Sequence, residues 1–515
     1  MISRILREIS HSTLFGLRSP CTKGISVPRK PLRLPSFSSS GTSIAKRSAC
    51  KVPSGGFVLR TFILFLGVSI PVFAATPHRE KSAAQSHKTD STNARIEKYL
   101  TEYPELRYLL DGTEKWQTNE GSDVVGGVDQ SYPKEFKRAI ACLDFLGKIL
   151  EGSEIAHATL VAAQREDVRL SFDTFSRLHT RINAFLDSGL KGLSREELKD
   201  LIYVLATMGD LGKSGVLREL FPHIKDEDHD KFVGKMLYAL KEDPSILPSY
   251  HRLSPAAQEI VQMPVPLHPG HGSHIEGGPG MFTALKESGI AAKHPWAIDL
   301  LEVLHCVDVM GAAGHVNPNS SLAFTEPCAK RIGYLFSSVR KFSDAAATEK
   351  TVLADYLKQM STSLGFQGTT KEEQTLARLG CMLRFYGPKD GALLAKAFAK
   401  LSPEKQADLV RSFHPFTCWP FETPTYVPAV LINASNSSKW GGSPEERIDA
   451  IFQNLLPFIA SIEVGYAKGV EEGKYATQDP LCFNSLAGVV RNQVVSLESS
   501  SWYIDKRMHP QVYPS

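Results

Sequence analysis

The 515-residue chain has an ordinary globular composition, with 42% hydrophobic and 22% charged residues. Its net charge of +4 is unevenly spread, because residues 1–75 contain eleven Lys and Arg but a single acid, Glu8. The rest of the chain carries 48 basic and 54 acidic residues. This acidic balance argues against a nucleic-acid-binding surface on the body of the protein.

Residues 1–75 have the composition of a targeting region. Residues 1–56 are rich in Arg and Ser, and an apolar stretch from Phe57 to Ala75 follows and ends in small residues. One interpretation is a bipartite presequence that directs the protein to the mitochondrial intermembrane space or inner membrane. The alternatives are a secretory signal that starts near Val58, giving a secreted or periplasmic protein, and a retained membrane anchor over 57–75.

The body of the chain is predicted to be all-α. Residues 76–93 are polar and without apolar periodicity, as in a flexible linker. Beyond them, apolar residues recur every three to four positions in nearly every segment. We expect a helical domain over 94–340 and a C-terminal helical region over 345–515.

Two segments bear on the details of this fold. Ser194 and Glu197 have the spacing of a capping box, which predicts the start of a helix. The stretch TYVPAVLINAS, residues 425–435, is the best strand candidate and fits a loop equally well. It lies within 414–442, a stretch rich in Pro, Trp and Asn that is expected to form a long surface loop.

The segment from His294 to His315 combines an apolar helix with polar side chains. In a helix, Leu301, His305 and Asp308 share one face with Leu304, and this apolar face is expected to point inward. A buried His and Asp must be paired, hydrogen-bonded or metal-bound. His305 and Asp308 are therefore either a structural pair or part of a metal or catalytic site, and His315 either caps this helix or reaches the same pocket.

Two further segments contain potential catalytic groups. The sequence GDLGK places Asp210 at the end of an apolar helix and Lys213 just after it, which a local turn would also explain. The loop HPGHGSHIEGGPG, residues 268–280, contains His268, His271 and His274 among five glycines.

The order of these residues resembles the HD superfamily of metal-dependent phosphohydrolases, which are all-α proteins. The resemblance covers about residues 170–315 and implies that an HD-like core carries additional C-terminal helices. It assigns metal-ligand roles to His179, Asp210 and Asp308. In two-metal members an extra pair of histidines is present, which corresponds here to His229 and one of His271 or His274.

The sequence departs from the HD pattern at Gly209, where the family has a histidine. Either His271 or His274 supplies the missing imidazole, or the site is degenerate and the domain no longer hydrolyses a substrate.

If the site is intact, its ligand types suit Mn²⁺, Fe²⁺, Zn²⁺ or Mg²⁺. The metal would activate a water molecule for attack on a phosphate ester, with Asp210 orienting that water. His274 and Lys213 would neutralise phosphate charge, and backbone amides of the glycine loop 270–280 would approach the phosphate oxygens.

The alternative is a non-catalytic helical interaction or assembly protein whose histidines are structural. The acids around His229, in DEDHD, also fit the ordinary charges of a helix N-terminus. P-loop, hydrolase-elbow, zincin and dinucleotide-binding motifs are missing from the sequence, and eight scattered cysteines without a CxxC argue against a cysteine zinc site.

Overall fold

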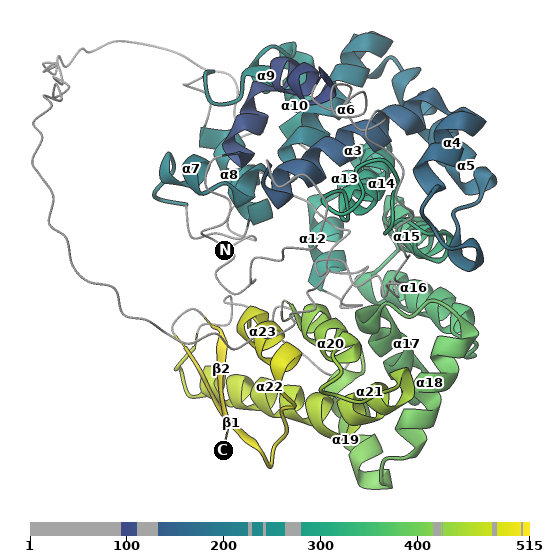
Figure 1. Ribbon diagram of the computed structural model, residues 1–515, viewed down its shortest axis with the longest axis vertical. Helices are drawn as coiled ribbons and strands as arrows, with labels where there is room; N and C mark the ends of the chain where they lie inside the picture. The colour runs from purple at the N-terminus through teal and green to yellow at the C-terminus, as the bar shows by residue number, and fades with distance from the viewer. Residues whose placement is uncertain are drawn as a thin grey trace, which may run out of the picture. The chain divides into compact units, whose positions relative to one another are not determined.

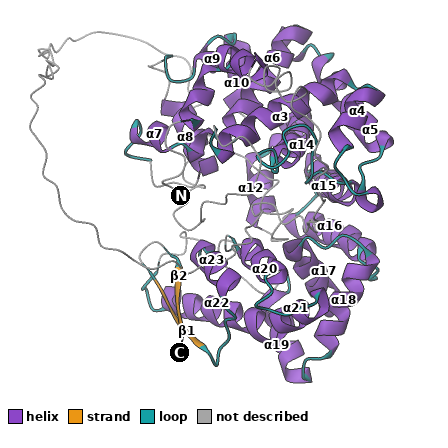
Figure 2. Cartoon of the chain, in the orientation of Figure 1, coloured by secondary structure: helices purple, strands orange, loops and turns teal. Residues whose placement is uncertain are grey.

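A computed structural model shows that the predicted all-α fold is correct (Figures 1 and 2). It describes residues 94–110, 132–224, 229–239, 244–262, 280–415, 424, 426–475, 481–505 and 508–514. These residues belong to one compact unit, Ile63–Ser515. The predicted targeting region and the linker 76–93 lie outside the described residues.

The first half of the described chain is made of helices of mixed length. A helix at 94–102 is followed by η1 (Pro104–Leu109), α3 (Lys134–Glu151), α4 (Glu154–Val161), η3 (Glu166–Val168), α5 (Phe172–Leu186), η4 (Leu190–Gly192), α6 (Arg195–Met208), η5 (Leu211–Lys213), α7 (Gly215–Glu219), α8 (His229–Ala239), α9 (Pro248–His251), α10 (Pro255–Gln262), α12 (Gly280–Ser288), α13 (Ile290–Lys293) and α14 (Pro295–Gly311).

The second half continues with helices and ends in a small sheet. Its elements are α15 (Glu326–Val339), η9 (Arg340–Ser343), α16 (Glu349–Ser363), α17 (Lys371–Leu383), α18 (Pro388–Ala399), α19 (Pro403–Phe413), α20 (Val427–Asn436), α21 (Pro444–Ala450), the π-helical turn η10 (Ile451–Leu455), α22 (Leu456–Glu471), α23 (Asn484–Asn492), β1 (Ser500–Ile504) and β2 (Pro510–Pro514).

Local sequence signals explain where several of these helices start. The side chain of Ser194 accepts a hydrogen bond from Glu197 N, and the Glu197 carboxylate accepts one from Ser194 N, so the predicted capping box is confirmed. Ser153 and Ser171 cap α4 and α5 by the same type of bond. Pro295 lies in the first turn of α14, as expected for a residue without an amide hydrogen.

Helix α14 is the central element of the first half. It packs against α3, α5, α6, α13 and α15. Its crossing with α3 is very close, because a Cβ atom added to Gly311 would lie 2.1 Å from Cys142 Sγ. At Gly314, just beyond the helix, the corresponding distance to Ala141 Cβ would be 2.3 Å. Small residues therefore set the distance between the two helices that carry the candidate site.

The second half differs from expectation at two places. The strand candidate within 425–435 is wrong, because Val427–Asn436 forms α20, which packs against α17 and α23. Pro428 occupies the first turn of this helix, where proline is well tolerated. The expected long loop over 414–442 is therefore interrupted by a buried helix.

A short antiparallel sheet at the C-terminal end was not predicted. Strands β1 and β2 pair in the register Trp502 with Val512, and β1 contacts α22. A Cβ atom added to Gly465 on α22 would lie 2.2 Å from the Trp502 ring, so this glycine makes room for the tryptophan.

The predicted boundary near 340–348 falls on η9 and the loop to α16. Helices α15 and α16 pack against each other across it. One helical run, Pro444–Glu471, is long and apolar enough to cross a membrane by composition, with a mean hydropathy of 1.2. Half of its most apolar 18-residue window is buried in the structure, and core helices of soluble proteins can have the same length and composition.

Candidate functional site: a buried polar cluster

The first turns of α3 place two opposite charges in the protein interior. Glu135 is 2% exposed and Arg138 is 5% exposed, and they form an ion pair of 2.9 Å between Oε2 and Nη1. The spacing of three residues puts both side chains on one face of the helix. That face continues through Cys142, so α3 buries charged and apolar residues in a single stripe.

The end of α6 adds a second pair of charges. Lys213 Nζ lies 2.6 Å from Asp210 Oδ1 and 2.9 Å from Glu135 Oε2. Glu135 therefore accepts hydrogen bonds from both Lys213 and Arg138. Burial opposes the charge of Lys213, but Asp210 and Glu135 outweigh it and raise the pKa of its ammonium group.

Helix α14 brings a third carboxylate, Asp308, to the same place. Burial opposes the charge of Arg138, whereas the carboxylates of Glu135, Asp210 and Asp308 raise its pKa. Burial and the same two aspartates also raise the pKa of the Cys142 thiol. Asp210 and Asp308 thus act on common neighbours, although they come from distant parts of the chain.

His315, just after α14, completes the group. Burial and the nearby cations Lys134 and Arg138 lower the pKa of its imidazole to about 4. The ring is therefore neutral at physiological pH. We call Glu135, Arg138, Asp210, Lys213, Asp308 and His315 the polar cluster.

Three atoms of the polar cluster are buried without a hydrogen-bond partner: Glu135 Oε1, Arg138 Nε and His315 Nδ1. A buried polar atom without a partner costs about 1–3 kcal/mol. The charges nearly balance, with three carboxylates against one guanidinium and one ammonium group, so the cluster has a net charge of about −1 when the imidazole is neutral.

His179 lies at the other end of α3. Its Nδ1 donates a hydrogen bond of 2.8 Å to Ile149 O, and its ring packs over Gly152, the residue that ends α3. Ile149 is eleven residues beyond Arg138, which corresponds to about 16 Å along a helix. Asp210 and Asp308 thus act electrostatically on the same arginine, whereas His179 lies too far along α3 to join them.

His305 has a different environment from Asp308. Its ring centroid lies 6.3 Å from that of Phe336 on α15, whereas Asp308 acts on residues of α3. The expected inward face of α14 is only partly correct, because Leu301 is buried but Leu304, His305 and Asp308 are half-buried. The reason is that α14 is surrounded by five helices, so its burial does not follow a single stripe.

The remaining predicted histidines are only partly within the described residues. His229 begins α8, which packs against η5 and hence near Lys213, but its side chain lies outside the described set. His268, His271 and His274 also lie outside it. Their predicted roles, including replacement of the imidazole missing at Gly209, stay predictions.

The ligand types in the polar cluster are chemically suited to a divalent metal. Carboxylate oxygens and a neutral imidazole nitrogen bind Mn²⁺, Fe²⁺, Zn²⁺ and Mg²⁺, and Glu135 Oε1 and His315 Nδ1 are free to do so. Within the described ranges, however, three His, Cys, Asp or Glu side chains are nowhere close enough together to hold a metal ion. Lys213 lies between the carboxylates instead.

Comparison with known families gives one match. Residues 148–483 match the model of a family described as a family of unknown function, DUF6829. The chain belongs to this family. Neither the curated proteins nor the solved structures contain a significant match.

The DUF6829 region contains four members of the polar cluster but begins after Glu135 and Arg138. Sequence reasoning missed these two residues, although a signal was present. Glu135, Arg138 and Cys142 recur at helical spacing among Phe and Ile residues, so charges interrupt an otherwise apolar face.

Proposed function

We propose that this DUF6829 protein is a divergent HD-type hydrolase of phosphate esters, with its active centre in the polar cluster. The observation that supports the proposal is the buried network in which Lys213 Nζ lies 2.6 Å from Asp210 and 2.9 Å from Glu135, with Asp308 near enough to raise the pKa of the adjoining Arg138. These two aspartates are the carboxylate ligands that the resemblance implies. Glu135 and His315 would replace the two histidines that are missing, one at Gly209 and one at the remote position of His179.

The residues of the cluster suit the steps of such a reaction. In the structure described, these side chains are too far apart to hold a metal ion, so Asp210, Asp308, Glu135 and His315 would have to close on a divalent cation as Lys213 leaves the carboxylates. The cation would then supply an activated water and polarise a phosphoryl oxygen. Asp210 would accept the proton of the attacking water once the hydrogen bond that its Oδ1 accepts from Lys213 Nζ is broken, because the adjacent ammonium group disfavours a protonated carboxyl. Lys213 would then turn toward the phosphate and offset its negative charge.

Metal analysis of purified full-length variants tests this proposal. We expect bound metal in the wild type, and at least tenfold less in Asp308→Ala and His315→Ala, because each removes a ligand. His179→Ala is the matched control and should retain its metal, since His179 is bonded to Ile149 O. Hydrolysis of bis(p-nitrophenyl) phosphate should follow the metal content. Equal metal in all four proteins would contradict the proposed ligands.

A second candidate function is that of a non-catalytic helical interaction protein. The pairing of Lys213 and Arg138 with Glu135 and Asp210 favours it, because a charge-balanced network can serve structure alone. This alternative expects a metal-free wild-type protein that does not hydrolyse the substrate. It also expects that a chelator leaves thermal stability unchanged.

A further inference from the structure

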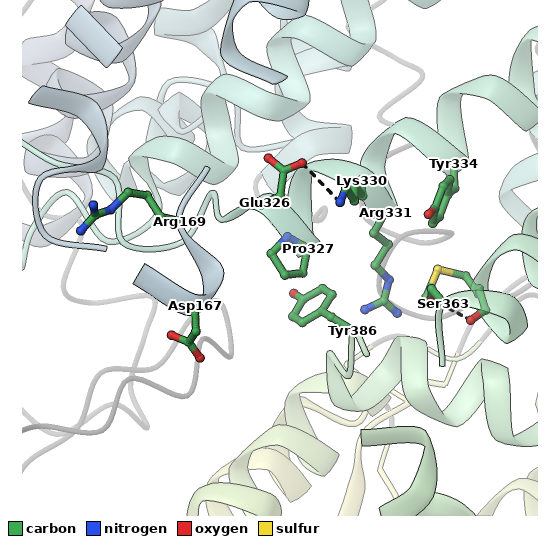
Figure 3. Close-up of a pocket in the computed structure, with 10 residues that line it drawn as sticks. Asp167, Arg169, Glu326, Pro327, Lys330, Arg331, Tyr334, Ser363 and Tyr386 are labelled. Atoms are coloured by element: carbon green, nitrogen blue, oxygen red, sulfur yellow. Dashed lines mark hydrogen bonds and ion pairs between the residues drawn. The ribbon is translucent and has the colours of Figure 1, made fainter. Parts of the chain in front are cut away.

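A cavity of about 270 Å³ lies beside α15, well apart in sequence from most of the polar cluster. Its lining includes Glu326, Lys330 and Arg331 of α15, Ser363 at the end of α16 and Tyr386 after α17 (Figure 3). The segment after α4 contributes Asp167 and Arg169 to the opposite side. The volume suits a small ligand rather than a large cofactor.

Arg331 is the unusual residue of this cavity. It is 1% exposed, and its Nε and both Nη atoms are buried without a well-formed hydrogen bond. Burial opposes its charge, whereas neighbouring groups that are neutral at pH 7, Cys381, Tyr356 and Tyr386, raise its pKa, with the Tyr356 hydroxyl also bonding toward it. The guanidinium extends toward Tyr386 and Ser363, with its Cζ 5.2 Å from the centroid of the Tyr386 ring (Figure 3). A stacked ring stabilises a cation only modestly and accepts none of its five N–H bonds.

A second buried guanidinium lies close to the first. Arg384, at the end of α17, is 8% exposed and its Nε also has no partner. Burial and the positive charge of Arg331 lower the pKa of Arg384. The two arginines therefore repel each other in a region of low polarity.

Carboxylates do not compensate this pair of charges. Within the described parts of the chain, neither Arg331 nor Arg384 forms an ion pair with an Asp or Glu. Glu326, an acid of the lining, accepts hydrogen bonds from Ser171 N, Ser171 Oγ and Thr174 Oγ1 and pairs with Lys330 at 3.5 Å. Asp167 pairs with Arg165 at 3.0 Å.

An uncompensated buried charge costs several kcal/mol, so a chain that retains one needs a reason. A guanidinium presents a planar fork of donors that fits the oxygens of a carboxylate or phosphate group. We propose that the Arg331 cavity binds an oxyanion, a phosphate or carboxylate group of a small molecule, with Arg331 as its counter-ion, Arg169 also in the lining, and Arg384 adding positive charge from outside the lining.

Calorimetric titration of the full chain tests the site directly. The probes are inorganic phosphate, glycerol 3-phosphate and succinate, each at constant ionic strength with chloride as the reference anion. Preference for the two phosphates assigns a phosphate ligand, and preference for succinate assigns a carboxylate. Equal heats for all probes and chloride would overturn the proposal.

Variants locate the binding. Arg331→Met should weaken binding at least tenfold and should raise the melting temperature of the ligand-free protein, because it removes an uncompensated charge. Arg378→Met is the matched control: this buried arginine of α17 donates to Phe413 O at 3.0 Å, so its loss should lower the melting temperature and leave binding intact. A lower melting temperature in Arg331→Met, with unchanged binding, would show that Arg331 is structural.

Two more variants keep the test decisive. Arg331→Lys retains the charge but loses the fork, so about tenfold weaker binding is expected even if the methionine variant does not fold. Asp308→Ala should bind the oxyanion normally, because Asp308 belongs to the polar cluster. Loss of binding in Asp308→Ala would instead place the oxyanion in the polar cluster, which separates this proposal from the proposed hydrolase.

Discussion

Single buried ionisable residues of this protein fall into three physical situations. In the polar cluster, Glu135 is ionised because Lys213 and Arg138 outweigh the cost of burial. Arg331 keeps its charge without an acidic partner among the described residues. Glu463 on α22 represents the third situation, a buried acid that keeps its proton: burial raises its pKa to about 8, although Arg378 opposes the change. An acid of this kind is protonated at neutral pH.

Glu463 predicts a pH dependence of stability. Because its pKa is raised above the ordinary value of 4.5, the folded state binds the proton more tightly than the unfolded state. The free energy of unfolding should therefore fall as pH rises from about 4.5 to 8, by up to roughly 4 kcal/mol from this residue. Glu463→Gln lacks this pH-dependent loss. The difference in free energy of unfolding between the variant and the wild type should therefore be larger, in favour of the variant, at pH 8 than at pH 5.

Urea denaturation of both proteins at pH 5 and pH 8 measures this difference. Glu471→Gln, an exposed position on the same helix, is the control and should show the same pH dependence as the wild type. If the Glu463→Gln and wild-type curves stay parallel between the two pH values, Glu463 is ionised in the folded protein.

At the scale of elements, helices followed from periodicity, and the exceptions have local causes. The Ser194 capping box could be predicted from the sequence because both of its hydrogen bonds connect residues only three positions apart. The strand prediction within 425–435 is wrong because the Val and Ile residues of this segment favour strands locally. Packing against α17 and α23 stabilises a helix there instead. The C-terminal hairpin was missed because packing of Trp502 over Gly465 is a long-range contact.

The crossing of α3 and α14 predicts a strong effect of one methyl group. In Gly311→Ala, the new Cβ would lie 2.1 Å from Cys142 Sγ and 3.0 Å from Arg138 O, so the helices must separate. We expect a loss of roughly 1–3 kcal/mol in the free energy of unfolding, although alanine normally favours a helix. Chemical denaturation measures it.

Gly333→Ala is the matched control for this change. Gly333 lies inside α15, and an added Cβ would have no heavy atom within 4 Å, so roughly 0.5–1 kcal/mol of stabilisation is expected. The double variant Gly311→Ala/Cys142→Ala should recover part of the loss, since it removes the sulfur atom. A stabilised Gly311→Ala single variant would contradict the close crossing.

Over the whole molecule, the sequence indicated part of the candidate site. Motif order predicts Asp210, Lys213 and Asp308 as site residues; in the structure Lys213 pairs with Asp210, and both aspartates raise the pKa of Arg138. His179 was selected in the same way but lies about 16 Å along α3, a distance that order along the chain does not encode. The sequence does not predict Arg331 as a site residue, because its burial without an acidic partner is visible only in the folded structure.

The N-terminal 75 residues carry the last prediction, which concerns where the whole protein resides. We propose that they direct the chain to the mitochondrial intermembrane space or inner membrane, given eleven basic residues and the apolar stretch that ends at Ala75. Full-length protein with a C-terminal tag should co-fractionate with mitochondria and begin close to Thr76 by N-terminal sequencing. Recovery of the processed protein from the medium or periplasm would indicate a secretory signal. An unprocessed chain that resists carbonate extraction would show that 57–75 is a retained anchor.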